Sequence, residues 1–189
     1  LVAGDLTTTG VPLEPAGTMT YHELFEIYTE QITALAEAGA DLLVVETMLG
    51  IDEMTVALEA AQSVCTLPVL CSMTVQADGS GYFGGTCVEA VETLQELGAA
   101  AVGINCSTGP DQLESLVRNM RQAAKVPLLV KPNAGMPEIS PEGEAVYSMG
   151  PAAFAQHMRT LIDAGAALVG GCCGTDPRYI SALRDVLPR

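Results

Sequence analysis

Short apolar runs alternate with longer amphipathic segments along the whole chain. Runs a few residues long, rich in Val, Leu, Ile and Ala, predict buried strands, whereas apolar residues repeated at helical spacing predict helices. The pattern predicts strands at 1–4, 41–45, 68–73, 100–105, 128–131 and 167–170, helices at 21–38, 52–64, 88–97, 111–124, 151–164 and 177–187, and long loops at 76–85 and 133–149.

This strict alternation is typical of an α/β fold with a parallel sheet. The junctions between helix and strand also repeat, as in Ala38–Leu42, Leu97–Ala101 and Ala164–Leu168. Such an internal repeat favours a barrel of βα units over an open, doubly wound sheet. In βα barrels, functional residues lie at the carboxyl ends of the strands, so we looked for chemistry there.

Length and charge restrict the class of protein. A chain of 189 residues suits one domain with a real core. Its net charge of −15, from 23 acidic and 8 basic residues, argues against nucleic acid and against an anionic membrane surface as partners. No apolar stretch approaches the length of a membrane span. Six cysteines without a dense framework suit a reducing compartment, and we expect the cytoplasm.

Two adjacent cysteines, Cys172 and Cys173, follow the strand predicted at 167–170 and are flanked by glycines. Neighbouring residues on a regular strand point to opposite faces, so the backbone must leave strand geometry if both sulfurs are to converge. An adjacent pair is a poor disulfide. The pair therefore either binds a soft metal ion or forms two small buried residues in a tight turn.

A third cysteine, Cys106, directly follows the strand predicted at 100–105. Strand ends meet on one face of a barrel, although 66 positions separate Cys106 from Cys172. Three sulfurs would hold zinc and leave one position open for a substrate. We interpret Cys65, Cys71 and Cys87 as ordinary small apolar residues.

Other polar residues are also expected at strand ends, namely Asp5, Glu46, Thr47, Thr74, Asn105 and Asn133. Glu46 is either a solvated loop acid or the partner of a substrate ammonium group. Asn133 is either a turn residue or a site amide.

The two histidines lie on predicted helices away from the strand ends. We expect His22 and His157 to be structural or solvated. No Ser-His-Asp arrangement can be assembled, so we assign no residue as catalytic in its own right.

Four segments, 44–48, 103–106, 131–135 and 169–175, together resemble the zinc-dependent homocysteine S-methyltransferases. The resemblance is closest to the homocysteine-binding domain of cobalamin-dependent methionine synthase, and it spans the chain in the family's order. It implies a TIM barrel with zinc on Cys106, Cys172 and Cys173 and the homocysteine sulfur as the next ligand. It also implies that Glu46 binds the substrate amino group and that Asn133 lies beside the metal. The substrate contacts assigned on this basis are Glu46, Asn105 and Asn133.

The sequence departs from the family at its beginning. The first two βα units of the family are absent, and the segment 7–10 replaces a Gly-Pro-Thr-Gly-like turn. We therefore expect residues 1–189 to be a homocysteine-binding (β/α)8 TIM-barrel domain with about six of its eight units. Its edge strands, 1–4 and 167–170, would then be exposed. We expect the isolated chain to be inactive unless the N-terminal part of the barrel accompanies it.

The activity implied by the resemblance is methyl transfer to the thiol of homocysteine, which gives methionine. The methyl donor would be methylcobalamin or methyltetrahydrofolate on other methionine synthase modules, so cobalamin would bind another domain. The alternatives are a betaine- or S-methylmethionine-dependent homocysteine methyltransferase, and a non-catalytic zinc-binding barrel. A lyase that forms a Schiff base on Lys131 is a further, minor alternative.

Overall fold

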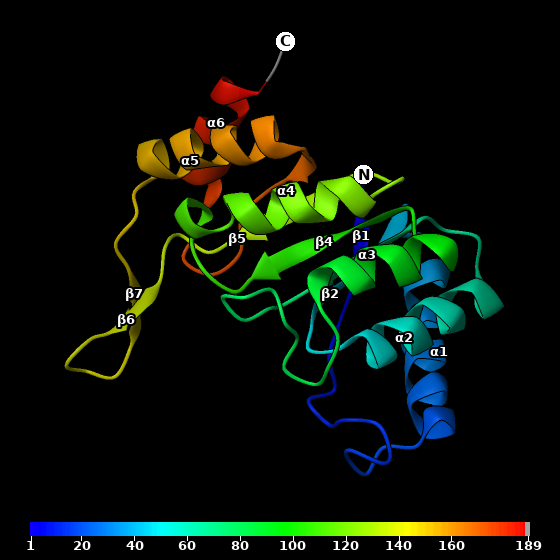
Figure 1. Ribbon diagram of the computed structural model, residues 1–189. Helices are drawn as coiled ribbons and strands as arrows, with labels where there is room; N and C mark the ends of the chain where they lie inside the picture. Colours follow the sequence, from blue (N-terminus) through cyan, green and yellow to red (C-terminus); the bar gives the residue numbers. More distant parts are fainter. Residues whose placement is uncertain (188–189) are drawn as a thin grey trace.

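A computed structural model describes residues 1–187 of the chain. Six parallel strands form one sheet in the order β1-β2-β3-β4-β5-β8. These strands are Ala3–Thr7, Leu42–Met48, Val69–Met73, Ala101–Cys106, Leu128–Pro132 and Ala166–Val169. The helices α1 to α6 are Tyr21–Glu37, Ile51–Val64, Cys87–Glu96, Glu114–Ala123, Pro151–Ala164 and Pro177–Val186 (Figure 1).

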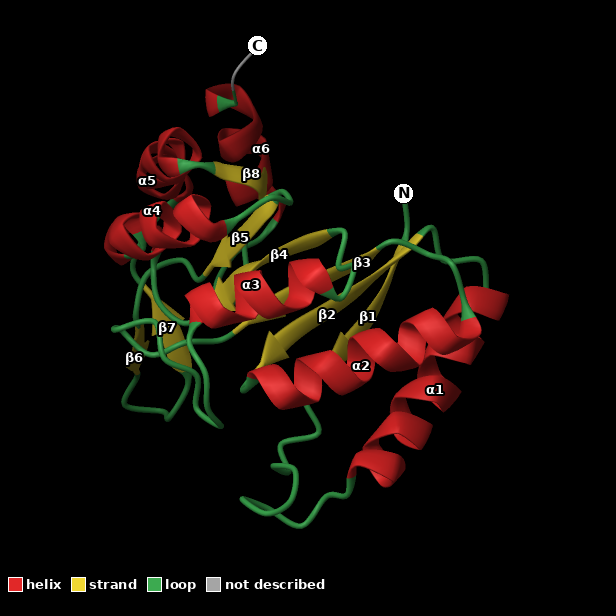
Figure 2. Ribbon diagram, turned by 45° about the vertical axis from the view of Figure 1, so that its right-hand side comes forward, coloured by secondary structure: helices red, strands yellow, loops and turns green. Residues whose placement is uncertain are grey.

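The order of the strands identifies the architecture. Each parallel strand lies beside the next parallel strand in the sequence, without the reversal of order that marks a doubly wound sheet. Figure 2 shows α2, α3 and α4 on the same side of this sheet. The chain thus has the arrangement of a TIM barrel with six strands in its described part, which confirms the predicted fold class.

The two faces of the sheet differ in burial at the edge strand β1, whereas residues of the central strands that point away from the helices, such as Ser72 and Asn105, are buried. Side chains directed at the helices form the core, as Val45 on β2 and Ile104 on β4 illustrate. We call the opposite side, which corresponds to the interior of a barrel, the inner face. On β1 the inner-face residues Ala3, Asp5 and Thr7 are exposed while Gly4 and Leu6 are buried. The strand registers place Ser72, Asn105 and Lys131 on the inner face too, and Glu46 beside Thr7.

The structure corrects several predicted boundaries. Strand β1 covers Ala3–Thr7 and not 1–4, so Asp5 lies inside a strand and not at its end. Strand β2 continues to Met48 and therefore contains Glu46. The helix expected at 111–124 is divided into a 3-10 turn, Pro110–Gln112, and α4.

The loop expected at 133–149 contains a β-hairpin. Its strands, β6 at Pro137–Ile139 and β7 at Ala145–Tyr147, pair antiparallel and project from the sheet (Figure 1). Among residues 1–187, no helix is both long and apolar enough to cross a membrane.

A buried carboxylate fixes the turn that follows β1. Glu53, on α2, is only 5% exposed. Its oxygens accept hydrogen bonds from the Thr8 hydroxyl at 2.6 Å, from the Thr9 backbone N–H at 2.7 Å and from the Tyr28 hydroxyl at 2.9 Å. Burial and the charge of Glu53 raise the pKa of Tyr28, so its hydroxyl remains a donor. The turn at Thr8 and Thr9 is therefore held by one acidic side chain.

We predict that Tyr28→Phe lowers the free energy of unfolding by about 1–3 kcal/mol, because one buried hydrogen bond to a charged acceptor is lost and no cavity forms. Urea denaturation measures this change. Tyr21→Phe is the matched control, since the Tyr21 hydroxyl bonds Glu59 on the exposed surface. Equal effects of the two substitutions would contradict the role given to Glu53.

Candidate metal centre

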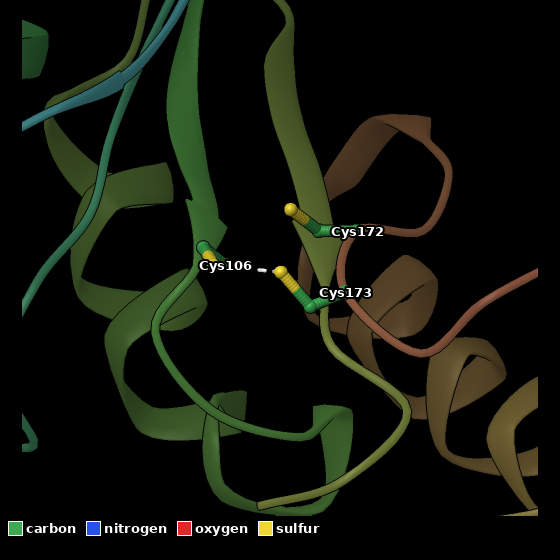
Figure 3. A group of neighbouring side chains, drawn as sticks. All are labelled: Cys106, Cys172 and Cys173. Carbon is green, nitrogen blue, oxygen red and sulfur yellow. Dashed lines mark hydrogen bonds between the residues drawn. The ribbon is translucent and has the colours of Figure 1, made fainter. Parts of the chain in front are cut away.

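The sheet brings together the three cysteines that the sequence singled out. Cys106 ends β4, and Cys172 and Cys173 lie in the turn after β8. Their sulfur atoms all lie within 4.8 Å of one another, and the Cys106 and Cys173 sulfurs are 3.6 Å apart (Figure 3). Within residues 1–187 no other group of His, Cys, Asp and Glu side chains is clustered in this way.

The backbone leaves regular geometry on both sides of the cluster. Cys106 and Ser107 have φ angles of 57° and 61°, a left-handed conformation that is uncommon for residues other than glycine. In the second turn, Gly174 has a φ of +77° and lies directly against the ring of Tyr147. A side chain at Gly171 would meet that of Thr175. The glycines thus provide the departure from strand geometry that adjacent converging cysteines require.

Strand β5 and the two residues that follow it, Asn133 and Ala134, hold the cysteine turn in place by hydrogen bonds. The backbone N–H of Cys172 donates to the Pro132 carbonyl at 2.8 Å, and the N–H of Ala134 donates to the Cys173 carbonyl at 2.9 Å. The Asn133 side chain accepts from the N–H of Cys173 at 3.1 Å and is only 4% exposed. The Asn133 side chain is therefore buried and bonded to the backbone of the cysteine turn.

Asn105 connects the cluster to the neighbouring strands. Its carbonyl oxygen accepts from the Thr47 N–H and from the Ser72 hydroxyl, both at 2.8 Å. Its amide group donates to the Thr47 hydroxyl at 2.8 Å and to the Cys172 sulfur at 3.8 Å. The side chain is 1% exposed, so each of these bonds is made away from bulk water.

The cluster favours negative charge on one sulfur. The Cys106 thiol lowers the pKa of Cys172 to about 5 against the opposing effect of burial, and the Asn105 amide acts in the same direction. The neighbouring Cys172 raises the pKa of Cys106. A thiolate is the form of cysteine that binds metals, and three sulfur donors suit a soft or borderline ion such as zinc. The donor set therefore fits the predicted metal.

An ion pair occupies the inner face next to the cluster. The Lys131 ammonium contacts the Glu46 carboxylate, and their side chains are 21% and 22% exposed. Burial lowers the pKa of Lys131, while the charges of Asp5 and Cys172 oppose that shift. Glu46 is thus a partly buried strand residue and not a loop acid. Because the Lys131 ammonium is already paired, it is poorly placed to form a Schiff base.

The remaining candidates lie away from the cluster. Cys71 and Cys87 are buried in the core, and burial raises the pKa of Cys71 to about 12. Cys65 caps the end of α2. His22 pairs with Glu26 at 3.3 Å on the surface of α1, and His157 is exposed on α5.

Two of the site's partners were not anticipated from the sequence. Ser72 and Tyr147 give no local signal, because a serine in an apolar strand and a tyrosine in a polar loop are both common. For Lys131 the sequence suggests a Schiff-base residue, although a lone lysine in an apolar strand is also a signal for a charge on the inner face.

Comparisons with known proteins identify the family of the chain. The family model described as Homocysteine S-methyltransferase matches residues 1–187. A methionine synthase of Mycobacterium leprae is 31% identical over 186 residues, which is 95% of this chain and 15% of that protein. The chain therefore spans only a small part of that relative.

Solved structures show the same fold. The homocysteine methyltransferase MmuM of Escherichia coli, in its apo form, is 25% identical and matches 99% of this chain and 63% of its own with a TM-score of 0.79. The metallated form of MmuM matches 85% of this chain and 51% of its own, at 25% identity, with a TM-score of 0.67.

We predict that Asn105→Asp raises the pKa of Cys172 in the metal-free protein, because a donor facing the sulfur is replaced by an anion. At pH 6 a thiol of pKa about 5 is mostly thiolate, and the thiolate fraction falls about tenfold per unit only once the pKa lies above the working pH. Alkylation of Cys172 at pH 6, followed by mass spectrometry, should therefore slow, by about tenfold if the pKa rises by roughly two units. Asn119→Asp on the exposed face of α4 is the control and should leave the rate unchanged.

Proposed function

Because the chain belongs to the homocysteine S-methyltransferase family, we propose that it binds homocysteine and presents its thiol for methyl transfer, with methionine as the product. The observation that carries this proposal is the arrangement of three cysteine sulfurs beside the Glu46–Lys131 pair. A metal held by the sulfur donors would bind the thiol of such an amino acid, and the inner-face carboxylate would bind its ammonium group.

We assign Cys106, Cys172 and Cys173 as the residues that hold zinc. The three lie within reach of one ion, and no fourth His, Cys, Asp or Glu ligand joins them in the described part of the chain, so one position stays available to a substrate. When bound, zinc supplies the positive charge that keeps a coordinated thiol deprotonated near neutral pH. Asn105 and Asn133 hold Cys172 and Cys173 in position for this task.

Glu46 is proposed to bind the ammonium group of homocysteine, and this orients the substrate sulfur toward the donor. In the transfer, the sulfur forms a bond to the methyl carbon while the bond between that carbon and the donor breaks, and the electron pair leaves with the donor. The product is a thioether, which is a weak ligand and can dissociate. No side chain of this chain needs to act as a general base in this scheme.

We propose methylcobalamin or methyltetrahydrofolate, carried by other methionine synthase modules, as the methyl donor. This chain matches only 15% of a methionine synthase, which supports the proposal that other parts of such a protein bind the methyl donor. Betaine and S-methylmethionine are the alternative donors. A non-catalytic zinc-binding barrel is the other alternative, and an available ligand position argues against it.

The barrel is proposed to be completed by two further βα units from an N-terminal part. The edge strands β1 and β8 and the exposed inner-face residues of β1 support this proposal. The free thiols suit a reducing compartment, and we propose the cytoplasm.

We predict that Cys106→Ser and Cys172→Ser each abolish stoichiometric zinc binding, because one of the three sulfur ligands is lost. Zinc content after dialysis against a weak chelator measures this. Cys65→Ser is the matched control, since Cys65 caps a helix and lies outside the cluster. Full zinc retention by Cys172→Ser would show that the ligand assignment is wrong.

We predict that Glu46→Gln weakens homocysteine binding by roughly 10–100-fold, because a charge-assisted bond to the ammonium is lost. Zinc content should stay the same. Calorimetric titration of the zinc-loaded protein measures the affinity, with Glu30→Gln on the exposed face of α1 as control. Unchanged homocysteine affinity in Glu46→Gln would remove Glu46 from the substrate site.

A further inference from the structure

Lys131 is set apart from the other cations of the chain. It lies in strand β5 and on the inner face, beside Asn105 in the strand register. The remaining described lysine and arginine residues lie on helices or directly after one, namely Arg118, Arg121, Lys125, Arg159, Arg178 and Arg184. In a protein with a net charge of −15, this one cation on the inner face is placed against the thiol cluster.

The contact between Lys131 and Glu46 spans the inner face. The two residues belong to β5 and β2, and β3 and β4 lie between these strands. The stem of Lys131 packs beside Gly170, where an added Cβ would approach the Lys131 Cγ to 3.3 Å. Since both side chains are only about a fifth exposed, each charge depends on the other for compensation.

The pair also lies next to the sulfur cluster. Thr47, the neighbour of Glu46, is bonded to the Asn105 side chain, and the same side chain contacts the Cys172 sulfur. The charge of Cys172 is one of the influences on Lys131. Three recognition elements therefore adjoin one another: a set of sulfur ligands, an anion and a cation.

We propose that Lys131 binds the α-carboxylate of homocysteine, and that the Glu46–Lys131 pair opens when the zwitterionic substrate enters. Glu46 then pairs with the substrate ammonium and Lys131 with the substrate carboxylate. This inference rests on the proposed function, and it adds a specificity-determining residue to it. The exchange leaves both partly buried charges compensated, before and after binding.

The exchange predicts selection against ligands that carry only one of the two charges. A thiol with an ammonium but no carboxylate would occupy Glu46 and leave Lys131 unpaired. A thiol with a carboxylate but no ammonium would leave Glu46 unpaired. Leaving a desolvated charge without a partner is costly, and sites built on such pairs discriminate strongly between ligands.

The test compares three thiols by calorimetry on the zinc-loaded protein: L-homocysteine, 3-amino-1-propanethiol, which lacks the carboxylate, and 4-mercaptobutanoate, which lacks the ammonium. We expect homocysteine to bind roughly 10–100-fold more tightly than either analogue. This comparison needs no variant, so it tests whether the site selects both charges of the ligand even where a substitution impairs folding. Equal affinities for homocysteine and 3-amino-1-propanethiol would overturn the inference.

The second part of the test uses the variant Lys131→Met. It should weaken homocysteine binding yet leave binding of 3-amino-1-propanethiol equal or tighter, because this ligand no longer has to break an ion pair. A loss of fold or of zinc would weaken both ligands together. Lys125→Met, at the exposed residue after α4, makes the same change of charge and should keep the wild-type preference.

The outcomes separate the two levels of the proposal. If the zinc-loaded wild-type protein does not bind homocysteine at all, the proposed function itself fails. If it binds homocysteine and Lys131→Met retains the wild-type preference over 3-amino-1-propanethiol, the proposed function stands and the role of Lys131 is wrong.

Discussion

The geometry of the candidate site depends on the side chain of Asn105. This one amide joins β4 to β2 and β3 through Thr47 and Ser72, and it reaches the Cys172 sulfur beyond β5. Because it is almost fully buried, the loss of any partner would leave a polar group unsatisfied in the core. The amide therefore fixes the distance between the cysteine sulfurs and the charged pair, and an Asp or a Leu of similar size could not do so.

Charge in this protein is divided between two environments. The acidic residues, which outnumber the basic ones by 23 to 8, lie largely on helices and in turns, where water solvates them. On the inner face, by contrast, Glu46 and Lys131 compensate each other beside a sulfur cluster that favours negative charge on Cys172. An acidic surface does not attract an anionic ligand, and under the proposal above a cation held inside the fold pairs with the substrate carboxylate.

The sequence was sufficient to predict the alternating elements and the three cysteines, because parallel strands bring their carboxyl ends together whatever the loops contain. It was not sufficient where tertiary pairing decides. Asp5 disfavours a strand locally, yet pairing with Val44 extends β1 through it. The strands of the hairpin at 137–147 are too short for any periodicity to be visible. The partner of Lys131 is 85 positions away, and no local pattern identifies it.

The way in which β5 frames the cysteine turn has a consequence for local unfolding. Cys106 lies on one side of β5, and the turn with Cys172 and Cys173 is bonded to its other side. Separation of the β8 edge from β5 would therefore pull the ligands apart, whereas fraying of β1 would leave them together. An ion bound by all three sulfurs would act as a clamp on the last strand, and the amide hydrogens of Gly170 and Cys172 would exchange with solvent more slowly while it is held.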